Sequence, residues 1–408
     1  MSASREAGAS RSGWSVAART GAALAGAMGV GRFVFTPVLP LMKAQAHLTS
    51  SGASTLATSN YLGYLVGALL GIAVPPLSRA RLALRVSGVV LVATLVVMPL
   101  TRDLAAWMAI RGLAGVASAV IFMVAGNTIL TELTSPQPRM VGWAYGGVGA
   151  GIALSGALVA VVKSLGDWKT AWWAAAALAG TLLAVAWTIG TTGPRIDGAT
   201  AGSAGWPRRS LHRRWFALLA GSYFLEGAGY IVAGTFLVAA ISATGPSWLS
   251  GSVWTIVGVA AVPSSAAWTS LSRRVSRPTL LTAALILQSV GIALPAITPS
   301  VPAALASAVL FGGTFVGITT LSLATGRHLK VPQAVAVLTA GYGIGQVLGP
   351  LVVIPTLHGG YRTALLVGAA LVLAAAATSA LLRIRFPHDD EAHHHNRNPN
   401  TRTRANRN

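Results

Sequence analysis

The chain has 408 residues, of which 53% are hydrophobic and only 10% charged, and its mean hydropathy is +0.64. Soluble domains carry roughly 25% charged residues, so this composition excludes a globular enzyme with one core and indicates a protein that crosses a membrane several times. The absence of cysteine excludes disulfides and thiolate metal sites. The net charge of +21 would suggest nucleic-acid binding in a soluble chain, but the positions of these charges argue against it.

Apolar runs long enough to span a bilayer, about 20 residues each, recur along the chain. The first run begins after several arginines, as a signal peptide does, but it is too long for a signal h-region, so we interpret it as a retained span. Runs of this length exclude the short strands of a membrane barrel and predict helices. The twelve predicted spans are residues 16–41, 52–74, 82–100, 104–133, 140–162, 168–190, 214–241, 248–271, 279–298, 301–326, 333–357 and 363–385.

The basic residues follow the positive-inside rule when the N-terminus is taken as cytoplasmic. Of the 30 Lys and Arg residues, 23 then fall in cytoplasmic segments, 5 on the opposite side and 2 inside spans. A wrong span count would destroy this asymmetry. The basic excess is therefore mainly topological; both termini are expected in the cytoplasm, and no nucleic-acid partner is expected.

Two halves of six spans each are predicted, because the longest polar gap divides the spans equally. Residues 147–156 (GVGAGIALSG) align with residues 341–350 (GYGIGQVLGP), and the same offset of 194 residues carries Arg32 onto Glu226. Parallel six-span repeats are a known transporter plan with the substrate site between them. The expected segments are an N-terminus at 1–15, a bundle at 16–190, a linker at 191–213, a bundle at 214–385 and a tail at 386–408.

The polar tail cannot bury apolar surface, and we expect it to be disordered. It contains His393–His395, which can bind a metal adventitiously, but a solvated tail is the favoured interpretation. No cofactor and no specific metal site are expected.

Several motifs resemble the major facilitator superfamily, and in particular its YbfB/YjiJ-type bacterial branch. Residues 29–42 (GVGRFVFTPVLPLM) resemble the opening motif of that branch, and residues 60–64 (NYLGY) and 223–230 (YFLEGAGY) are similar to its second and seventh spans. Residues 111–115 (RGLAG) resemble the fourth-span arginine motif of proton-coupled members. The resemblance implies an all-α membrane protein of twelve transmembrane helices in two pseudo-symmetric six-helix bundles, located in the bacterial cytoplasmic membrane.

The chain also departs from the superfamily pattern. The glycine-rich fifth span lacks the proline of the antiporter motif. The loops at residues 75–81 (PPLSRAR) and 271–277 (LSRRVSR) lack the acidic residue that usually belongs to their Gly- and Arg-rich motif. The usual gating by these loops is therefore not carried over to this chain.

Three charges lie deep inside spans: Arg32, Arg111 and Glu226. A charge at the bilayer centre costs at least about 2.5–3.5 kcal/mol, so such residues are retained when they are paired, solvated or used. One alternative is a structural ion pair between Glu226 and an arginine. The other is a site in which an arginine holds an anionic or polar group while Glu226, the one deep acid, exchanges a proton.

Polar and aromatic residues inside the spans are the other candidates for substrate contact. Each can equally hydrogen-bond a neighbouring helix. The candidates for the site are Asn60, Tyr61, Tyr64, Tyr223, Tyr230, Tyr342 and Gln346, and the same two alternatives hold for Asn127 and Gln288.

The predicted function is that of a secondary active transporter that moves a small organic solute by alternating access, coupled to protons, with export favoured over uptake. Proton-coupled uptake of an organic anion, and a passive facilitator in which Glu226 is structural, remain as alternatives. An intramembrane enzyme is disfavoured because no histidine and only one acid lie deep in a span. The expected partners are the solute, protons and the lipid bilayer, and the expected state is a monomer.

Overall fold

The computed structural model describes residues 2–78, 80–133, 138–189, 210–329, 331, 334–384 and 386, and in this part of the chain it contains helices and no strands. The first segments are α1 (Ser2–Leu24), the π-helical η1 (Ala25–Arg32) and α2 (Phe35–Gln45). The long helices that follow are α3 (Ser50–Ala73), α4 (Arg81–Val97), α5 (Leu104–Glu132), α6 (Pro138–Leu165), α7 (Trp168–Val185), α8 (Ser210–Thr244), α9 (Ser247–Leu271), α10 (Arg277–Ile297), α11 (Val301–His328), α12 (Ala334–Val353) and α13 (Tyr361–Leu381). Short 3-10 turns are η2 (Pro75–Ser78), η3 (Met98–Leu100) and η4 (Ile354–Gly359).

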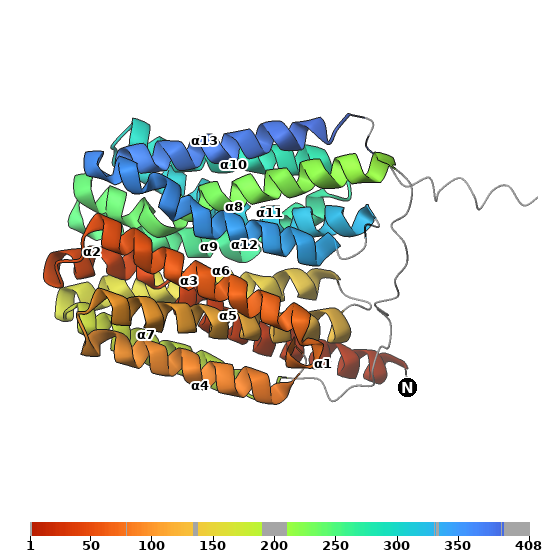
Figure 1. The fold of residues 1–408 in the computed structure, drawn as a ribbon. Coiled ribbons are helices and arrows are strands. Elements are labelled where there is room, and N and C mark those ends of the chain that lie inside the picture. Colours follow the sequence, from red (N-terminus) through yellow and green to blue (C-terminus); the bar gives the residue numbers. More distant parts are fainter. Residues whose placement is uncertain are drawn as a thin grey trace, which may run out of the picture.

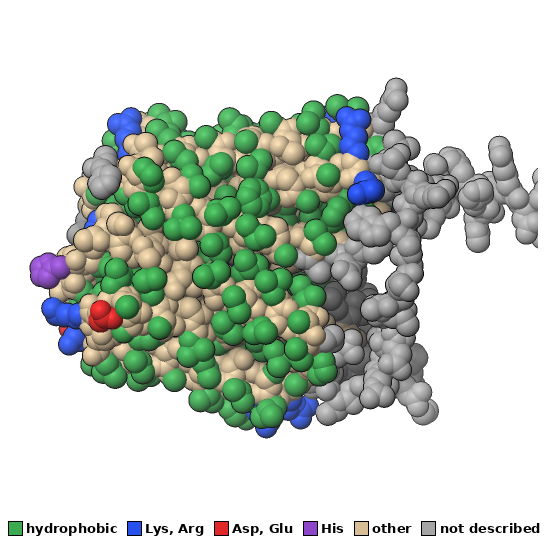
Figure 2. Space-filling model, in the orientation of Figure 1, with side chains coloured by type: hydrophobic (Ala, Val, Ile, Leu, Met, Phe, Trp, Pro, Cys, Tyr) green, Lys and Arg blue, Asp and Glu red, His purple; other side chains and the backbone are tan. Residues whose placement is uncertain are grey.

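The predicted twelve spans are confirmed in the described residues, because α1, η1 and α2 together form the first span and α3 to α13 form the others. Ten of these segments are long and apolar enough to cross a membrane by composition alone. The two that fall short are α7, whose hydropathy is lowered by Lys169 and three tryptophans, and α9, whose hydropathy is lowered by serine, threonine and tryptophan. Figure 2 shows the matching surface, with apolar side chains along the flank and charged ones gathered towards the two ends.

Helix ends differ from the predicted span ends by several residues. The first span was predicted from residue 16, whereas α1 begins at Ser2; α7 ends at Val185, before the predicted residue 190. Helices extend past apolar runs because polar residues also form helix, so an apolar run marks the buried part only. Residues 191–209 of the predicted linker and residues 387–408 of the predicted tail, including His393–His395, lie outside the described residues.

Figure 1 shows the two halves stacked side by side, α1 to α7 in one and α8 to α13 in the other. We call the end of the bundle that holds the start of α1 the N-terminal face, and the other end the opposite face. Helix α5 shifted by the 194-residue offset falls on α11 to within three residues at either end. The packing repeats as well, since α3–α5, α4–α7 and α1–α6 in the first half correspond to α9–α11, α10–α13 and α8–α12 in the second. The halves are therefore pseudo-symmetric.

Side-chain caps start several helices at the opposite face. Thr49, Asp103, Asp167 and Ser300 each accept a backbone N–H from the first turn of α3, α5, α7 and α11, respectively. At Asp167 the carboxylate accepts both the N–H and the hydroxyl of Thr170 at 2.8 Å, and these bonds hold the pKa of Asp167 below its ordinary value. The caps fix where these helices begin, next to the loops that join them.

The two halves meet along α3–α12, α6–α9 and α2–α8. Glycines let α6 and α9 approach closely: a Cβ at Gly258 would lie 2.1 Å from the backbone nitrogen of Ala153, and one at Gly149 would lie 2.5 Å from that of Val262. The first and seventh spans are deeply enclosed, with 94% and 83% of an 18-residue apolar stretch of each buried. Residues on these two spans are thus placed at the centre of the molecule, where the halves face each other.

Candidate functional site

The first span is interrupted next to Arg32, and the interruption exposes backbone carbonyl groups. The π-helical η1 ends at Arg32, the N–H of Thr36 turns back to the carbonyl of Phe33 at 3.2 Å, and Pro37 has no N–H to donate. The carbonyl oxygens of Gly31 and Arg32 are therefore left to other donors.

Arg111 on α5 supplies those donors. Its Nη1 donates to the carbonyl of Gly31 at 3.2 Å, and its Nη2 donates to the carbonyl of Arg32 at 3.0 Å. The guanidinium is buried, lying 5.4 Å from the ring centre of Phe35 and 5.8 Å from that of Trp172. Arg111 thus holds the break in the first span from within the N-terminal half.

Asn60 on α3 belongs to the same group, because its Nδ2 donates to the carbonyl of Arg111 at 2.8 Å. It ties the second span to the fourth. Both Asn60 and Arg111 were predicted to contact substrate or ions. In this arrangement their side chains bond backbone atoms of the N-terminal half.

The side chain of Arg32 reaches across to the other half. Its Nη2 donates to Oε1 of Gln346 on α12 at 2.6 Å, and Nε2 of Gln346 donates in turn to the hydroxyl of Tyr230 on α8. On its own side the guanidinium carbon lies 4.2 Å from the ring centre of Tyr64 and 5.0 Å from that of Tyr61. Arg32 is buried, and its Nε has no hydrogen-bond partner. Arg32 therefore joins both halves, and its Nε–H remains available to donate a further hydrogen bond.

Tyrosines from both halves extend this group. The hydroxyl of Tyr61 lies 2.9 Å from Oγ1 of Thr235 across the interface. Tyr342 on α12 stacks between Tyr223 and Tyr230 of α8, with ring centres 4.3 Å and 5.5 Å apart. We call the following residues the interfacial cluster: Arg32, Tyr61, Tyr64, Tyr223, Tyr230, Tyr342 and Gln346.

Glu226 has a different environment, inside the C-terminal half. Its side chain is fully buried, and neither carboxyl oxygen has a hydrogen-bond partner. Its polar neighbour is the Gln288 amide of α10, although no hydrogen bond of ordinary geometry joins them. The ion pair between Glu226 and an arginine is absent from this conformation, since Arg32 bonds Gln346 and Arg111 bonds backbone carbonyls.

Hydrogen bonds close the interface between the cluster and the opposite face. Thr36 donates to the carbonyl of Gly234, Ser54 donates to that of Pro350 at 2.6 Å, and Lys43 donates to the hydroxyl of Tyr361 at 2.6 Å. Each of these three bonds links one half to the other. The two halves are therefore bonded directly to each other between the cluster and the opposite face.

Thr36, Thr235, Lys43 and Tyr361 were not among the predicted site residues. Hydroxyl groups are frequent in these spans, and only their partners across the interface distinguish Thr36 and Thr235. Lys43 and Tyr361 lie at span ends, where a charge or an aromatic ring is usually explained by topology alone. The presence of Thr36 within the motif at residues 29–42 is the one sequence signal that could have pointed to it.

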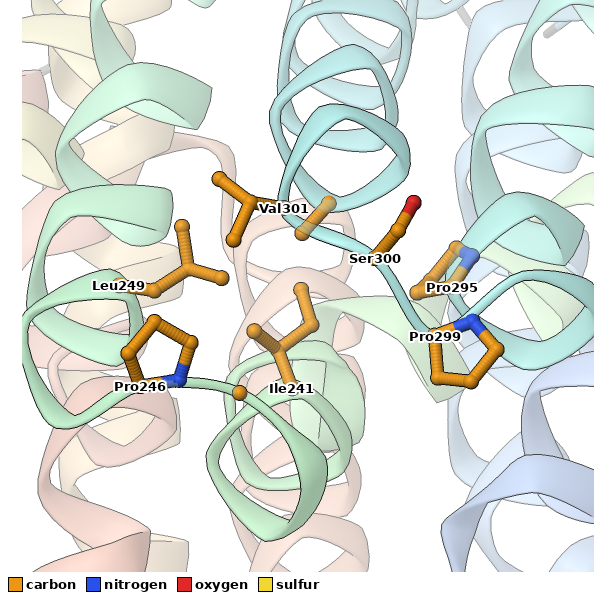
Figure 3. A pocket seen from close by; sticks show the side chains of 9 residues that line it. Ile241, Pro246, Leu249, Pro295, Pro299, Ser300 and Val301 are labelled. Carbon is orange, nitrogen blue, oxygen red and sulfur yellow. The ribbon is translucent and has the colours of Figure 1, made fainter.

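A cavity of about 240 Å³ lies elsewhere, at the opposite face between α8, α9, α10 and α11. Figure 3 shows its apolar walls, with Ile241, Leu249 and Pro295 among the residues that line it and no charged side chain. None of the predicted site residues lines it. Ser300 is the one residue with a polar side chain among those that line it, and its hydroxyl already caps α11, so the interfacial cluster is the better candidate site.

Comparisons with known proteins agree with the geometry. Residues 24–380 match a family described as the uncharacterised MFS-type transporter YbfB. The solved structure of a mutant of the nucleoside transporter NupG superposes with a TM-score of 0.68 over 91% of this chain and 100% of that one, at 14% sequence identity. This identity is low enough that the likeness shows the fold alone. Among curated proteins, no sequence matches the chain.

Proposed function

The chain belongs to the family of uncharacterised YbfB-type transporters of the major facilitator superfamily, and from this premise we propose that it moves a small organic solute across the bacterial cytoplasmic membrane in exchange for protons. It is a multi-pass transporter and not an enzyme. Export is proposed over uptake on the basis of the fourth-span motif that begins at Arg111, which resembles the arginine motif of proton-coupled members of the superfamily. The functional unit is proposed to be the monomer, since one chain supplies both sides of the interfacial cluster.

The observation that carries this proposal is the bond from Arg32 to Gln346 across the two halves. Alternating access requires the halves to separate on one side at a time around a central site. A solute that accepts hydrogen bonds from Arg32 would replace Gln346 and change how the halves are held together. The bonds at the opposite face support a conformation closed on that side, and opening it would require breaking the contact between Lys43 and Tyr361.

An anionic or strongly polar group on the solute is favoured by the charge of the cluster. Arginine carries a positive charge, and Nη2 of Arg32 bonds a neutral amide rather than a carboxylate. The rings of Tyr61 and Tyr64 lie beside this charge. We therefore propose an organic acid, or a solute with a comparable acceptor, as the substrate class.

Proton coupling is proposed to reside in Glu226. A buried carboxylate without a partner is strongly unfavourable, so the neutral acid is the form that this environment accommodates. Release of that proton then requires a conformation in which the carboxyl meets water or a donor. This gives the protein a proton-bound and a proton-free form, as coupling requires.

The test is a pH-gradient experiment on purified protein in proteoliposomes. A thermal-shift screen of organic acids, with neutral sugars as the comparison set, first identifies a stabilising solute. Flux of that solute is expected to be accompanied by measurable proton movement and to respond to an imposed pH gradient. Solute flux that ignores the gradient and carries no protons would instead establish a passive facilitator.

The orientation gives a second prediction. Because the chain has no cysteine, single substitutions Arg102→Cys and Arg274→Cys can be labelled on a clean background. Both positions are exposed, at opposite ends of the bundle. In intact cells, an impermeant thiol reagent is expected to label the cysteine at 102 and to spare the one at 274, and in lysed cells it should label both. The reverse pattern would place the N-terminal face outside the cell.

A further inference from the structure

Glu226 and Gln288 share an unusual condition. Both side chains are fully buried, on α8 and α10 of the C-terminal half. Both carboxyl oxygens of Glu226 and both polar atoms of the Gln288 amide lack hydrogen-bond partners. Buried polar groups are normally satisfied, so two adjacent unsatisfied groups need an explanation.

The chemistry of an amide supplies it. An amide has an acceptor oxygen and an NH₂ donor, so it can accept the proton of a neutral carboxyl group and can also donate to an ionised one. A rotation about the end of the side chain is enough to exchange these roles.

We infer that Gln288 is the positioning residue of the coupling proton: it pairs with the carboxyl of Glu226 and serves both of its protonation states. The inference rests on the proposed proton coupling. It places the proton inside the C-terminal half, next to Tyr223, Tyr230 and Tyr342 of the interfacial cluster.

The groups around the carboxyl fit this assignment. The phenols of Tyr223, Tyr230 and Tyr342 are the titratable groups that face it. Helices α2, α9, α10, α11, α12 and α13 all pack against α8. The described charged and titratable side chains of these helices and of α8, other than the tyrosines named above, lie towards the helix ends: Lys43, Arg213, Arg214, Arg277, Arg327, His328, Tyr361 and Arg362.

The two intramembrane arginines are engaged elsewhere: Arg32 bonds Gln346, which in turn bonds Tyr230, and Arg111 bonds backbone carbonyl groups of the first span. No cation therefore compensates an ionised Glu226 in the described part of the chain. An uncharged partner such as Gln288 is what remains to hold the carboxyl in place.

The experiment exchanges the two groups. The single variants Glu226→Gln and Gln288→Glu give an amide–amide and an acid–acid pair, whereas the double variant E226Q/Q288E restores one acid and one amide with the helices exchanged. The carbonyl stretch of a protonated carboxylic acid is followed by infrared difference spectroscopy across pH. In parallel, pH-gradient-driven flux of the stabilising solute is measured in proteoliposomes.

The wild type should show an acid band that is absent from Glu226→Gln. In Gln288→Leu the band should persist but shift to higher frequency, as for a carboxyl without a hydrogen bond, and coupled flux should fall by about tenfold, the worth of one hydrogen bond to a charged group. The double variant should recover a hydrogen-bonded acid band together with part of the coupled flux. Ser289→Ala is the matched control, since Ser289 is the next residue on α10 and donates to the carbonyl of Ala369 at 2.8 Å; it should leave the band in place.

An acid band with the same frequency in Gln288→Leu as in the wild type would overturn the pairing, whatever the flux shows. A band that shifts as expected in a protein whose wild-type flux carries no protons would retain the pairing and refute the coupling. The two failures are thus separable. The spectra also need no transport activity, so they remain informative for variants that are slow.

Discussion

Arg32→Leu is expected to abolish transport and the rise in melting temperature that the solute causes. The melting temperature of the solute-free protein should stay close to that of the wild type. The substitution removes a buried charge whose Nη2 bonds the amide oxygen of Gln346. The loss of that bond leaves one amide acceptor unsatisfied, at about 1–3 kcal/mol, but the desolvation of a guanidinium is no longer required. A residue whose removal eliminates function without much loss of stability is typical of a site.

The alternative of a structural ion pair gives the opposite result. If Arg32 compensated Glu226, its removal would leave an unpaired buried carboxylate and would destabilise the protein by about 3–5 kcal/mol. Adding Glu226→Gln would then restore stability. Melting temperatures of Arg32→Leu, Glu226→Gln and the double variant distinguish these cases, and we expect no rescue.

Arg32→Lys refines the test. Lysine keeps the charge but loses the planar fork that stacks on Tyr64 and Tyr61, so we expect a weakening of solute binding of about tenfold or more. Arg85→Lys serves as the control, because Arg85 packs on Trp187 at a half-buried position by the N-terminal face, away from the interfacial cluster. It should change neither binding nor flux.

The fold could be predicted from the sequence because membrane helices leave strong one-dimensional signals. Apolar runs give the number of spans, and the distribution of arginines between loops supports the same number. The repeat of residues 147–156 at 341–350 predicted two related halves, and the packing of α1–α6 and α8–α12 in the structure confirms it. These features depend on composition and spacing, which the sequence contains directly.

The candidate site could be predicted only as a set of residues at the right depth. Depth follows from the rise along a helix, but the direction of a side chain and its partner depend on the neighbouring helices. Arg32 and Glu226 are equivalent under the repeat, yet Arg32 reaches Gln346, 314 residues away in sequence, whereas Glu226 lies beside Gln288 in its own half. Arg32 and Glu226 therefore have different partners although they occupy equivalent positions, so the pseudo-symmetry of the two halves does not extend to the bonding of these side chains.

The role of Arg111 was the least accessible to sequence analysis. A guanidinium in the fourth span suggested a carboxylate ligand, since arginine binds carboxylates bidentately. The structure instead shows two carbonyl acceptors, Gly31 and Arg32, created by a π-helical break that no hydrophobic periodicity reveals. The two Nη donors of an arginine can bond either a carboxylate or two neighbouring backbone carbonyl groups, and only the tertiary structure shows which of the two is present.

Arg111→Lys is expected to lose both stability and transport. A lysine ammonium is a point donor and cannot bridge the carbonyls of Gly31 and Arg32 as the planar guanidinium does, so at least one buried carbonyl is left unsatisfied, at about 1–3 kcal/mol. Arg111→Met leaves both unsatisfied and should lower the melting temperature further. Since the Arg32 backbone is then no longer held, solute affinity should fall in the same order across the two variants.

The relation between stability and binding decides how Arg111 acts. As a positioning residue it lowers both together, in contrast to Arg32, where binding is lost and stability is retained. Melting temperatures and solute dissociation constants measured on the same preparations of Arg111→Lys, Arg111→Met and Arg32→Leu make this comparison. If Arg111→Lys keeps the wild-type melting temperature but no longer binds the solute, then Arg111 contacts the solute itself, in a conformation where its guanidinium has left the carbonyls of the first span.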